Sequence, residues 1–148
     1  MPTEHATSAQ LEWEHCQSFA ITSDVIWRLD AYRAAFYLLC LARADCRALK
    51  ASGVAQDLID QLMTASGSVS ANLSEGYSRG TRTDRLRFYG YALSSARECV
   101  IWYEAQRDEL PDDAVDARLV LLSRVRALLL GMIKSARETG AGGRRFDP

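Results

Sequence analysis

Apolar residues recur at helical spacing along most of this chain, in four blocks separated by short breaks. No block shows the sustained alternation of apolar and polar residues that is typical of a half-buried strand. The breaks contain residues that end or begin helices, namely Ser52-Gly53, Gly80-Thr81 and Pro111. The pattern predicts an all-α protein with helices at about residues 23–51, 54–78, 82–110 and 113–138.

Short connections between long helices place consecutive helices antiparallel to one another. Blocks of roughly 25 residues would each form a helix roughly 38 Å long. A chain of 148 residues is long enough to bury one core and has the size of one domain. We therefore expect an up-down-up-down four-helix bundle over residues 21–139. A flexible acidic segment, residues 1–20, would precede it, and a disordered tail, residues 140–148, would follow it.

The second block is unusually rich in small residues. Between Thr64 and Gly76, eight of thirteen positions are Ala, Ser or Gly, although a glycine inside a helix costs about 1 kcal/mol relative to alanine. A helix with so little side-chain volume lets a neighbouring helix approach closely. The third block offers a matching stripe, which contains Phe88, Ala92, Ser95, Cys99 and Trp102.

Polar residues of the second block share one stripe: Gln61, Ser68, Asn72, Glu75 and Arg79. We expect this stripe to meet Ser95 and Glu98 of the third block in a buried hydrogen-bond network that holds the helix register. The alternative is a small hydrolase-like enzyme in which Glu75 and Glu98 form an acid/base pair. The structural network is favoured, because no nucleophile-plus-base set accompanies the two carboxylates.

These motifs resemble those of a bacterial four-helix-bundle protein family that includes the proteins encoded in intervening sequences of 23S rRNA. The residues that carry the resemblance are Gln61, Leu62, Ser68, Asn72, Glu75, Gly76, Arg79, Phe88, Ala92, Ser95 and Glu98. The likeness extends more loosely over about residues 20 to 138. It implies an antiparallel four-helix bundle that assembles into a homo-oligomeric ring, commonly a pentamer, with no established catalytic activity.

More distantly, the chain resembles the accessory variability determinant of diversity-generating retroelements, a basic pentameric bundle. That resemblance implies nucleic acid and a reverse transcriptase as partners. The chain itself carries 18 basic and 19 acidic residues, a formal net charge of -1. An anionic partner would therefore have to bind a local basic patch.

Such a patch is present where the second block ends and the third begins. Residues 77–97 contain one acidic residue, Asp84, and five basic ones, Arg79, Arg82, Arg85, Arg87 and Arg97. Repeated around a ring, the first four of these arginines would form a belt that contacts RNA, DNA or another acidic partner. The alternative is an ordinary solvated arginine face.

Several blocks carry a second apolar row, set away from the expected core row. Its members are Ile59, Met63, Leu93, Val100, Leu121 and Leu128. One apolar stripe per helix suffices for an isolated bundle, so the second rows indicate a surface buried between subunits. The alternative is that wide stripes simply reflect a broad core within one subunit.

Several chemistries find no support in the sequence. The two histidines, His5 and His15, lie in the expected N-terminal segment, so we expect no metal. No Walker-type phosphate loop is present, so we expect no cofactor. The four cysteines form no CxxC pair and are expected to be reduced. No apolar run approaches the roughly 18 residues that cross a membrane. We therefore expect a cytoplasmic, non-enzymatic scaffold that binds nucleic acid or a protein.

Overall fold

The computed structural model describes residues 5–139. Its α-helices are α1 (Ser8–His15), α2 (Phe19–Thr22), α3 (Asp30–Ala51), α4 (Gln56–Ser78), α5 (Arg82–Ala105) and α6 (Asp112–Glu138). Two short 3₁₀ helices, η1 (Val25–Arg28) and η2 (Arg107–Glu109), precede α3 and α6. Residues 5–139 contain no strand, which confirms the all-α class. The expected disordered tail, residues 140–148, lies outside the described residues.

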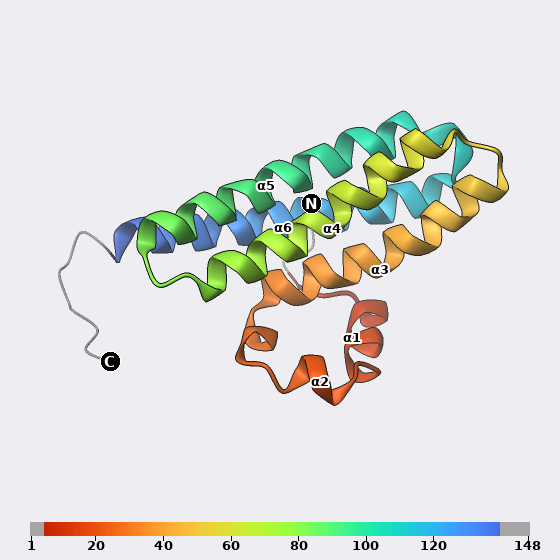
Figure 1. Cartoon of the computed structure of the whole chain (residues 1–148). Coiled ribbons are helices and arrows are strands. Elements are labelled where there is room, and N and C mark those ends of the chain that lie inside the picture. The colour runs from red at the N-terminus through yellow and green to blue at the C-terminus, as the bar shows by residue number, and fades with distance from the viewer. Residues whose placement is uncertain (1–4, 140–148) are drawn as a thin grey trace.

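The four long helices, α3 to α6, lie alongside one another with consecutive helices antiparallel (Figure 1). α4 packs against α3 and α5, and α6 packs against α5 and α3, so that each helix has two neighbours. The core between them is apolar and includes fully buried leucines from three helices, namely Leu38, Leu49, Leu62, Leu73, Leu122 and Leu129. Each such side chain contributes about 1.5–3 kcal/mol relative to remaining exposed.

Two helix boundaries differ from the sequence-based expectation. α3 begins at Asp30 and not near residue 23, because the Asp24 carboxylate accepts a hydrogen bond from the amide of Ile26 at 3.0 Å and caps η1 instead. Leu29 then takes an extended backbone conformation that separates η1 from α3. α5 ends at Ala105, several residues before the expected end near residue 110, and η2 follows it.

Other boundary signals act as expected. The Thr81 hydroxyl accepts a hydrogen bond from the amide of Asp84 at 3.2 Å and caps α5. Gly53, which follows α3, has a φ of 81°, a conformation that glycine adopts at little cost. These local contacts explain why the breaks after α3 and α4 could be placed from the sequence.

The second apolar rows lie mainly inside the subunit, which corrects the expectation that they form an oligomer surface. Ile59, Leu93 and Leu121 are 4%, 7% and 9% exposed and belong to the core. Met63, Val100 and Leu128 are half-buried and pack against that core. Because every long helix has two helical neighbours, each needs a wide apolar face or two stripes.

The N-terminal segment differs from the expected flexible lead-in, because residues 8–28 form α1, α2 and η1 beside the bundle (Figure 1). Trp13 of α1 anchors this segment. Its ring lies 5.2 Å from that of Phe36 and 5.1 Å from that of Tyr37, between ring centroids, and both partners belong to α3. Phe19 of α2 does not dock and is 82% exposed. Aromatic packing therefore orders an acidic segment that carries only a few apolar residues.

The four cysteines are free thiols. Cys46 and Cys99 are buried, Cys40 is half-buried, and Cys16 is exposed. Burial raises the pKa of Cys99 from 9.0 to about 12, and the nearby Glu98 charge acts in the same direction. Cys99 therefore stays protonated in the folded protein at a pH where the thiol of an unfolded chain ionises.

The higher pKa of Cys99 in the folded state than in the unfolded state predicts that the protein loses stability at alkaline pH. Because the folded-state pKa of Cys99 is raised, the unfolded state releases its proton first, and the stability present below pH 9 is lost progressively as the pH rises toward 12. At pH 10 the loss from this one thiol is on the order of 1 kcal/mol. Urea unfolding at pH 8 and pH 10 should show a smaller pH effect in Cys99→Ala. Cys16→Ala, at an exposed site, should behave like the unsubstituted protein.

Candidate nucleic-acid interface at the turn between α4 and α5

Gly76 lets α5 approach the end of α4. This glycine is buried, and a Cβ atom on it would lie 2.8 Å from two ring carbons of Tyr89 and 3.0 Å from the Cβ of Phe88. Distances this short exclude any side chain unless α5 or the ring of Tyr89 moves. The small-residue character of α4 therefore has a steric reason at this position. Gly67 differs, because a Cβ there would meet only Leu39 of α3, at 3.9 Å.

The polar stripes of α4 and α5 do not form the expected buried junction. In residues 5–139, no hydrogen bond joins the α4 stripe to Ser95 or Glu98. Asn72 donates from Nδ2 to the carbonyl oxygen of Ser68, 2.8 Å away on its own helix. Glu98 is exposed and accepts from the indole of Trp102 at 3.3 Å, also within one helix.

The remaining stripe residues are likewise at or near the surface. Gln61 is exposed, Ser68 and Ser95 are half-buried, and Glu75 forms an ion pair with Arg79 one turn further along. The side chains of Glu75 and Arg79 are 46% and 42% exposed. A helical stripe shows which residues share a face, whereas burial of that face depends on where neighbouring helices sit. Here α5 covers Gly76 and leaves Glu75 in solvent.

Phe88 is held between two arginines. The guanidinium carbon of Arg79 lies 4.9 Å from the ring centroid and that of Arg87 lies 5.3 Å from it. Arg87 also pairs with Asp84, at 2.8 Å between Nη2 and Oδ1. Since Arg79 pairs with Glu75, both of these arginines have a carboxylate partner. Their positive charges are largely balanced within the turn.

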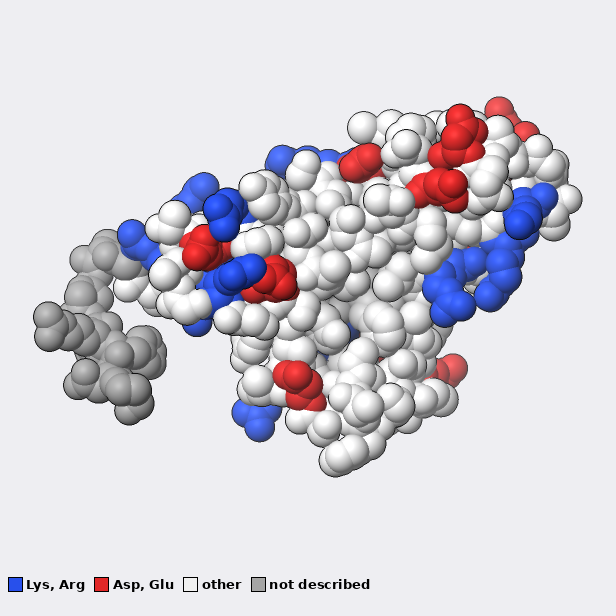
Figure 2. All heavy atoms as spheres, viewed as in Figure 1, with Lys and Arg blue, Asp and Glu red and all other residues white. Residues whose placement is uncertain are grey.

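Arg82 and Arg85 differ from this pair. Arg85 donates from Nε to the carbonyl oxygen of Arg79 at 2.7 Å, and Arg82 reaches the carbonyl oxygen of Arg137 at 3.5 Å. In the part of the chain that the structure describes, neither guanidinium forms an ion pair with a carboxylate. Both side chains are exposed. Basic side chains with some acidic ones among them gather at this end of the bundle in Figure 2.

A groove continues this basic surface between the start of α5 and the end of α6. Its volume is about 550 Å³. Arg85 and Tyr89 line it from α5, and Leu128, Met132 and Ser135 are among the residues that line it from α6. A cationic residue beside a partly apolar groove can contact a phosphate and support the sugar or base next to it.

Sequence reasoning missed a buried polar cluster near the other end of the bundle. Asp45 of α3 is 8% exposed and accepts hydrogen bonds from Nε and Nη2 of Arg118 at 2.9 and 3.1 Å. The hydroxyl of Tyr103 donates to the same carboxylate at 2.8 Å. Burial, and then the charge of Asp45, raise the pKa of Tyr103 above its usual range. The cluster ties α3, α5 and α6 together.

A signal for this cluster exists in the sequence. Asp45 stands at helical spacing from Leu38, Ala42 and Leu49, all of which belong to the core stripe of α3. A carboxylate on such a stripe needs a charged partner, because an unpaired buried charge is very costly. The pattern does not say which arginine supplies that partner.

Among residues 5–139, no group of three or more His, Cys, Asp or Glu side chains is arranged to hold a metal ion. Within the same range, no helix combines the length and the apolar character needed to cross a membrane.

The fold and its arginine-bearing turn define a class: an antiparallel bundle of four long helices with a short helical segment appended at the N-terminal side. The chain belongs to the family described as 23S rRNA-intervening sequence protein, whose model matches residues 28–121. The match spans α3, α4 and α5 and the first part of α6, which is more than half of the chain. It confirms the resemblance seen in the motifs of α4 and α5, and α1 and α2 lie outside it.

A solved structure supports the same fold. It is the crystal structure of a protein of unknown function from the S23 ribosomal protein family of Bacteroides thetaiotaomicron VPI-5482. The two chains are 17% identical and superpose with a TM-score of 0.67 over 70% of this chain and 98% of the other. At this identity the likeness concerns the fold alone. A comparison with curated proteins finds no match.

Proposed function

We propose that this protein is a non-catalytic helical scaffold that self-associates and binds RNA or DNA through the turn between α4 and α5. The observation that carries the proposal is the placement of Arg82 and Arg85, two exposed guanidinium groups without an ion-pair partner in the described residues, at the turn whose groove Arg85 lines. Exposed cations that no carboxylate balances are free to replace the counterions of a phosphate backbone. The family description names 23S rRNA, which makes RNA the first probe to test.

Self-association finds support in exposed apolar side chains, although these are not the ones expected from the sequence. Tyr91 and Ile101 on α5 are 51% and 62% exposed, and Val120 and Leu130 on α6 are 42% and 49% exposed. These side chains would be sequestered if subunits met along α5 and α6. A ring, with the pentamer that the family resemblance implies, would repeat Arg82 and Arg85 in every subunit.

Two other roles are less well supported. A protein partner, such as a reverse transcriptase, could use the same exposed apolar side chains, but nothing on this surface selects it over a second copy of the chain. An enzyme that uses Glu75 and Glu98 would need a protected carboxylate pair. Both side chains are exposed, and each contacts a residue four positions further along the chain.

The double substitution Arg82→Ala plus Arg85→Ala tests the nucleic-acid interface. We expect binding of a 23S rRNA fragment to weaken by about tenfold or more at low salt. The slope of log affinity against log salt should fall by roughly 0.9 for each phosphate that the variant no longer neutralises. Retention of labelled RNA and DNA, measured between about 50 and 200 mM salt, gives both quantities. Light scattering on the same samples gives the number of subunits.

The matched control is Arg43→Ala plus Arg47→Ala, which removes the same charge from exposed positions on α3. This control should retain most of the binding. The interface is refuted if the unsubstituted protein shows no retention at low salt, or if both double variants lose binding equally. A monomer in light scattering would refute the self-associating scaffold independently of the RNA result.

A further inference from the structure

A cavity of about 300 Å³ lies between the N-terminal segment, α3 and α6. Its apolar walls come from Leu41 of α3, Val120 and Leu121 of α6 and the ring of Tyr37. Its polar lining includes Gln10, Arg118 and Arg124. A mostly apolar pocket of this size with a few polar groups is typical of a small-molecule site.

Arg124 is the unusual member of this lining. It is 7% exposed, and its one hydrogen bond within the described residues runs from Nη1 to the Oε1 of Gln10, at 2.9 Å. Its Nε is buried without a partner, and no carboxylate of residues 5–139 forms an ion pair with it. A buried guanidinium in this state carries a large desolvation cost that a bound anion would offset.

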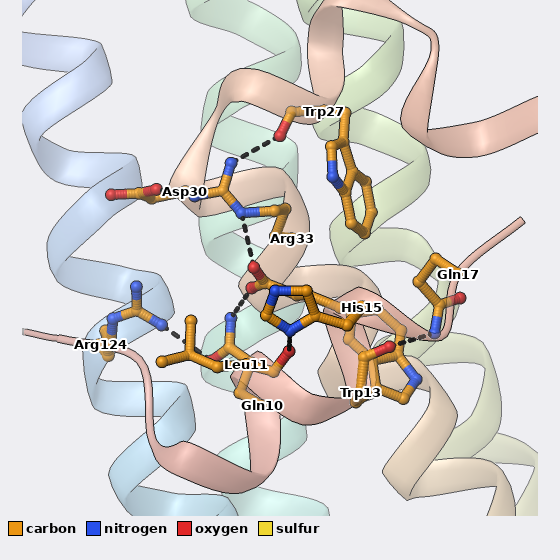
Figure 3. A network of polar contacts seen from close by, with 10 residues as sticks. Gln10, Leu11, Trp13, His15, Gln17, Trp27, Asp30, Arg33 and Arg124 are labelled. Atoms are coloured by element: carbon orange, nitrogen blue, oxygen red, sulfur yellow. Dashed lines mark hydrogen bonds and ion pairs between the residues drawn. The ribbon is translucent and has the colours of Figure 1, made fainter. Parts of the chain in front are cut away.

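The carboxylate that contacts Gln10, that of Glu14, is already paired with another arginine. Glu14 accepts from Nε2 of Gln10 at 2.7 Å and pairs with Nε of Arg33 at 3.2 Å. The contacts thus run from Arg124 through Gln10 and Glu14 to Arg33, which also donates to the carbonyl oxygen of Trp27. Figure 3 shows Arg124, Gln10, Arg33 and Trp27 along this chain of contacts. Gln10 therefore turns its amide nitrogen toward Glu14 and its oxygen toward Arg124.

The second arginine of the cavity lining, Arg118, already has a carboxylate partner. Arg118 gives two hydrogen bonds to Asp45, and Tyr103 occupies that carboxylate as well. Arg118 thus adds polarity to the cavity without adding an uncompensated charge. The positive charge that remains to be balanced in the lining is that of Arg124.

We propose that this cavity binds a small organic monoanion, namely a carboxylate with an apolar body, and that Arg124 is its charge partner. The carboxylate accepts hydrogen bonds from the guanidinium, while the apolar body contacts Leu41, Val120 and Leu121. α1 supplies Gln10, so the site is completed by a segment outside the family-matched residues 28–121. The site is separate from the arginine turn and does not depend on nucleic-acid binding.

Hexanoate and its neutral analogue hexanamide are suitable probes, because they share an apolar chain and differ in charge. Titration calorimetry of the full chain should show saturable binding of hexanoate, accompanied by a rise in melting temperature. Hexanamide should bind at least tenfold more weakly. Equal binding of the two compounds, or no binding of hexanoate, would overturn the proposal.

Substitutions test whether hexanoate binds in this cavity and contacts Arg124. Arg124→Gln should weaken hexanoate binding about 10- to 100-fold, the range for loss of hydrogen bonds to a charged group. Ala117→Phe, on the exposed rim of the cavity, should block the apolar chain and leave Arg124 in place. This second variant keeps the test decisive if Arg124→Gln disturbs docking of α1. Arg126→Gln, two residues along α6 and outside the cavity lining, should bind normally.

Glu4, which lies outside the described residues, precedes His5 of the cavity lining in the sequence. Glu4→Gln should bind hexanoate as well as, or more tightly than, the unsubstituted protein. Loss of binding in Glu4→Gln or Arg126→Gln, or full binding in Arg124→Gln, would contradict the assignment of Arg124.

Discussion

Replacing Asp45 by Asn is expected to lower the free energy of unfolding by about 3 kcal/mol. The substitution keeps the size of the side chain but removes the negative charge, so the guanidinium of Arg118 loses its partner in a site where its side chain is 16% exposed. Breaking a buried ion pair on one side costs about 3–5 kcal/mol, and the slight exposure of this pair places it at the lower end. Urea unfolding monitored by circular dichroism measures the loss.

Two further variants separate the contributions to this cluster. Tyr103→Phe removes one hydrogen bond to Asp45 and should cost about 1 kcal/mol. Asp57→Asn removes a charge from an exposed position in the first turn of α4 and should change stability by no more than about 0.5 kcal/mol. If Asp45→Asn proved as mild as Asp57→Asn, the cluster would have no role in holding α3, α5 and α6 together.

Gly76→Ala should be the second strongly destabilising change, with a net loss of about 2 kcal/mol. The added methyl group would lie 2.8 Å from the ring of Tyr89, so that α5 or the ring has to move. Overpacking of this kind commonly costs about 1–3 kcal/mol. Two contacts of 2.8 Å place the cost near the upper end of this range. The overpacking cost therefore exceeds the gain of up to about 1 kcal/mol that alanine brings over glycine within a helix.

Gly67→Ala is the matched control on the same helix. Its new methyl group would make an ordinary contact with Leu39 at 3.9 Å, so stability should rise by about 0.5–1 kcal/mol. Thermal and urea unfolding of both variants measure the contrast. Equal effects of the two alanines would show that α4 and α5 are not in close contact at Gly76.

The arrangement of polar residues within the candidate interface was predictable only in part. The cluster of arginines near the turn between α4 and α5 is visible in the sequence, since its members lie close together along the chain. The sequence does not show which of these arginines keep a charge that no carboxylate balances. Arg79 and Arg87 pair with Glu75 and Asp84 three or four residues away, whereas Arg82 and Arg85 meet only backbone oxygens.

Long-range polar contacts could not be predicted from sequence patterns. Asp45 and Arg118 are separated by 73 positions, and Gln10 and Arg124 by 114. Periodicity can show that Asp45 lies on a core stripe, but selection of its partner requires the relative rotation of α3 and α6. The expected junction of Asn72 with Glu98 was wrong for the same reason, since two stripes on adjacent helices need not face each other.

Local patterns in the amino-acid sequence were enough to predict the helical class, the breaks after α3 and α4 and the motif that carries the family resemblance, because these depend on residues within a few turns of one another. The packing of the helices was needed to show that Ile59, Leu93 and Leu121 are core residues, that α1 docks through Trp13, and that Arg124 is buried beside a cavity. Burial is a property of the assembled helices. Each side chain is exposed or enclosed according to what packs against its face, and no local pattern contains that information.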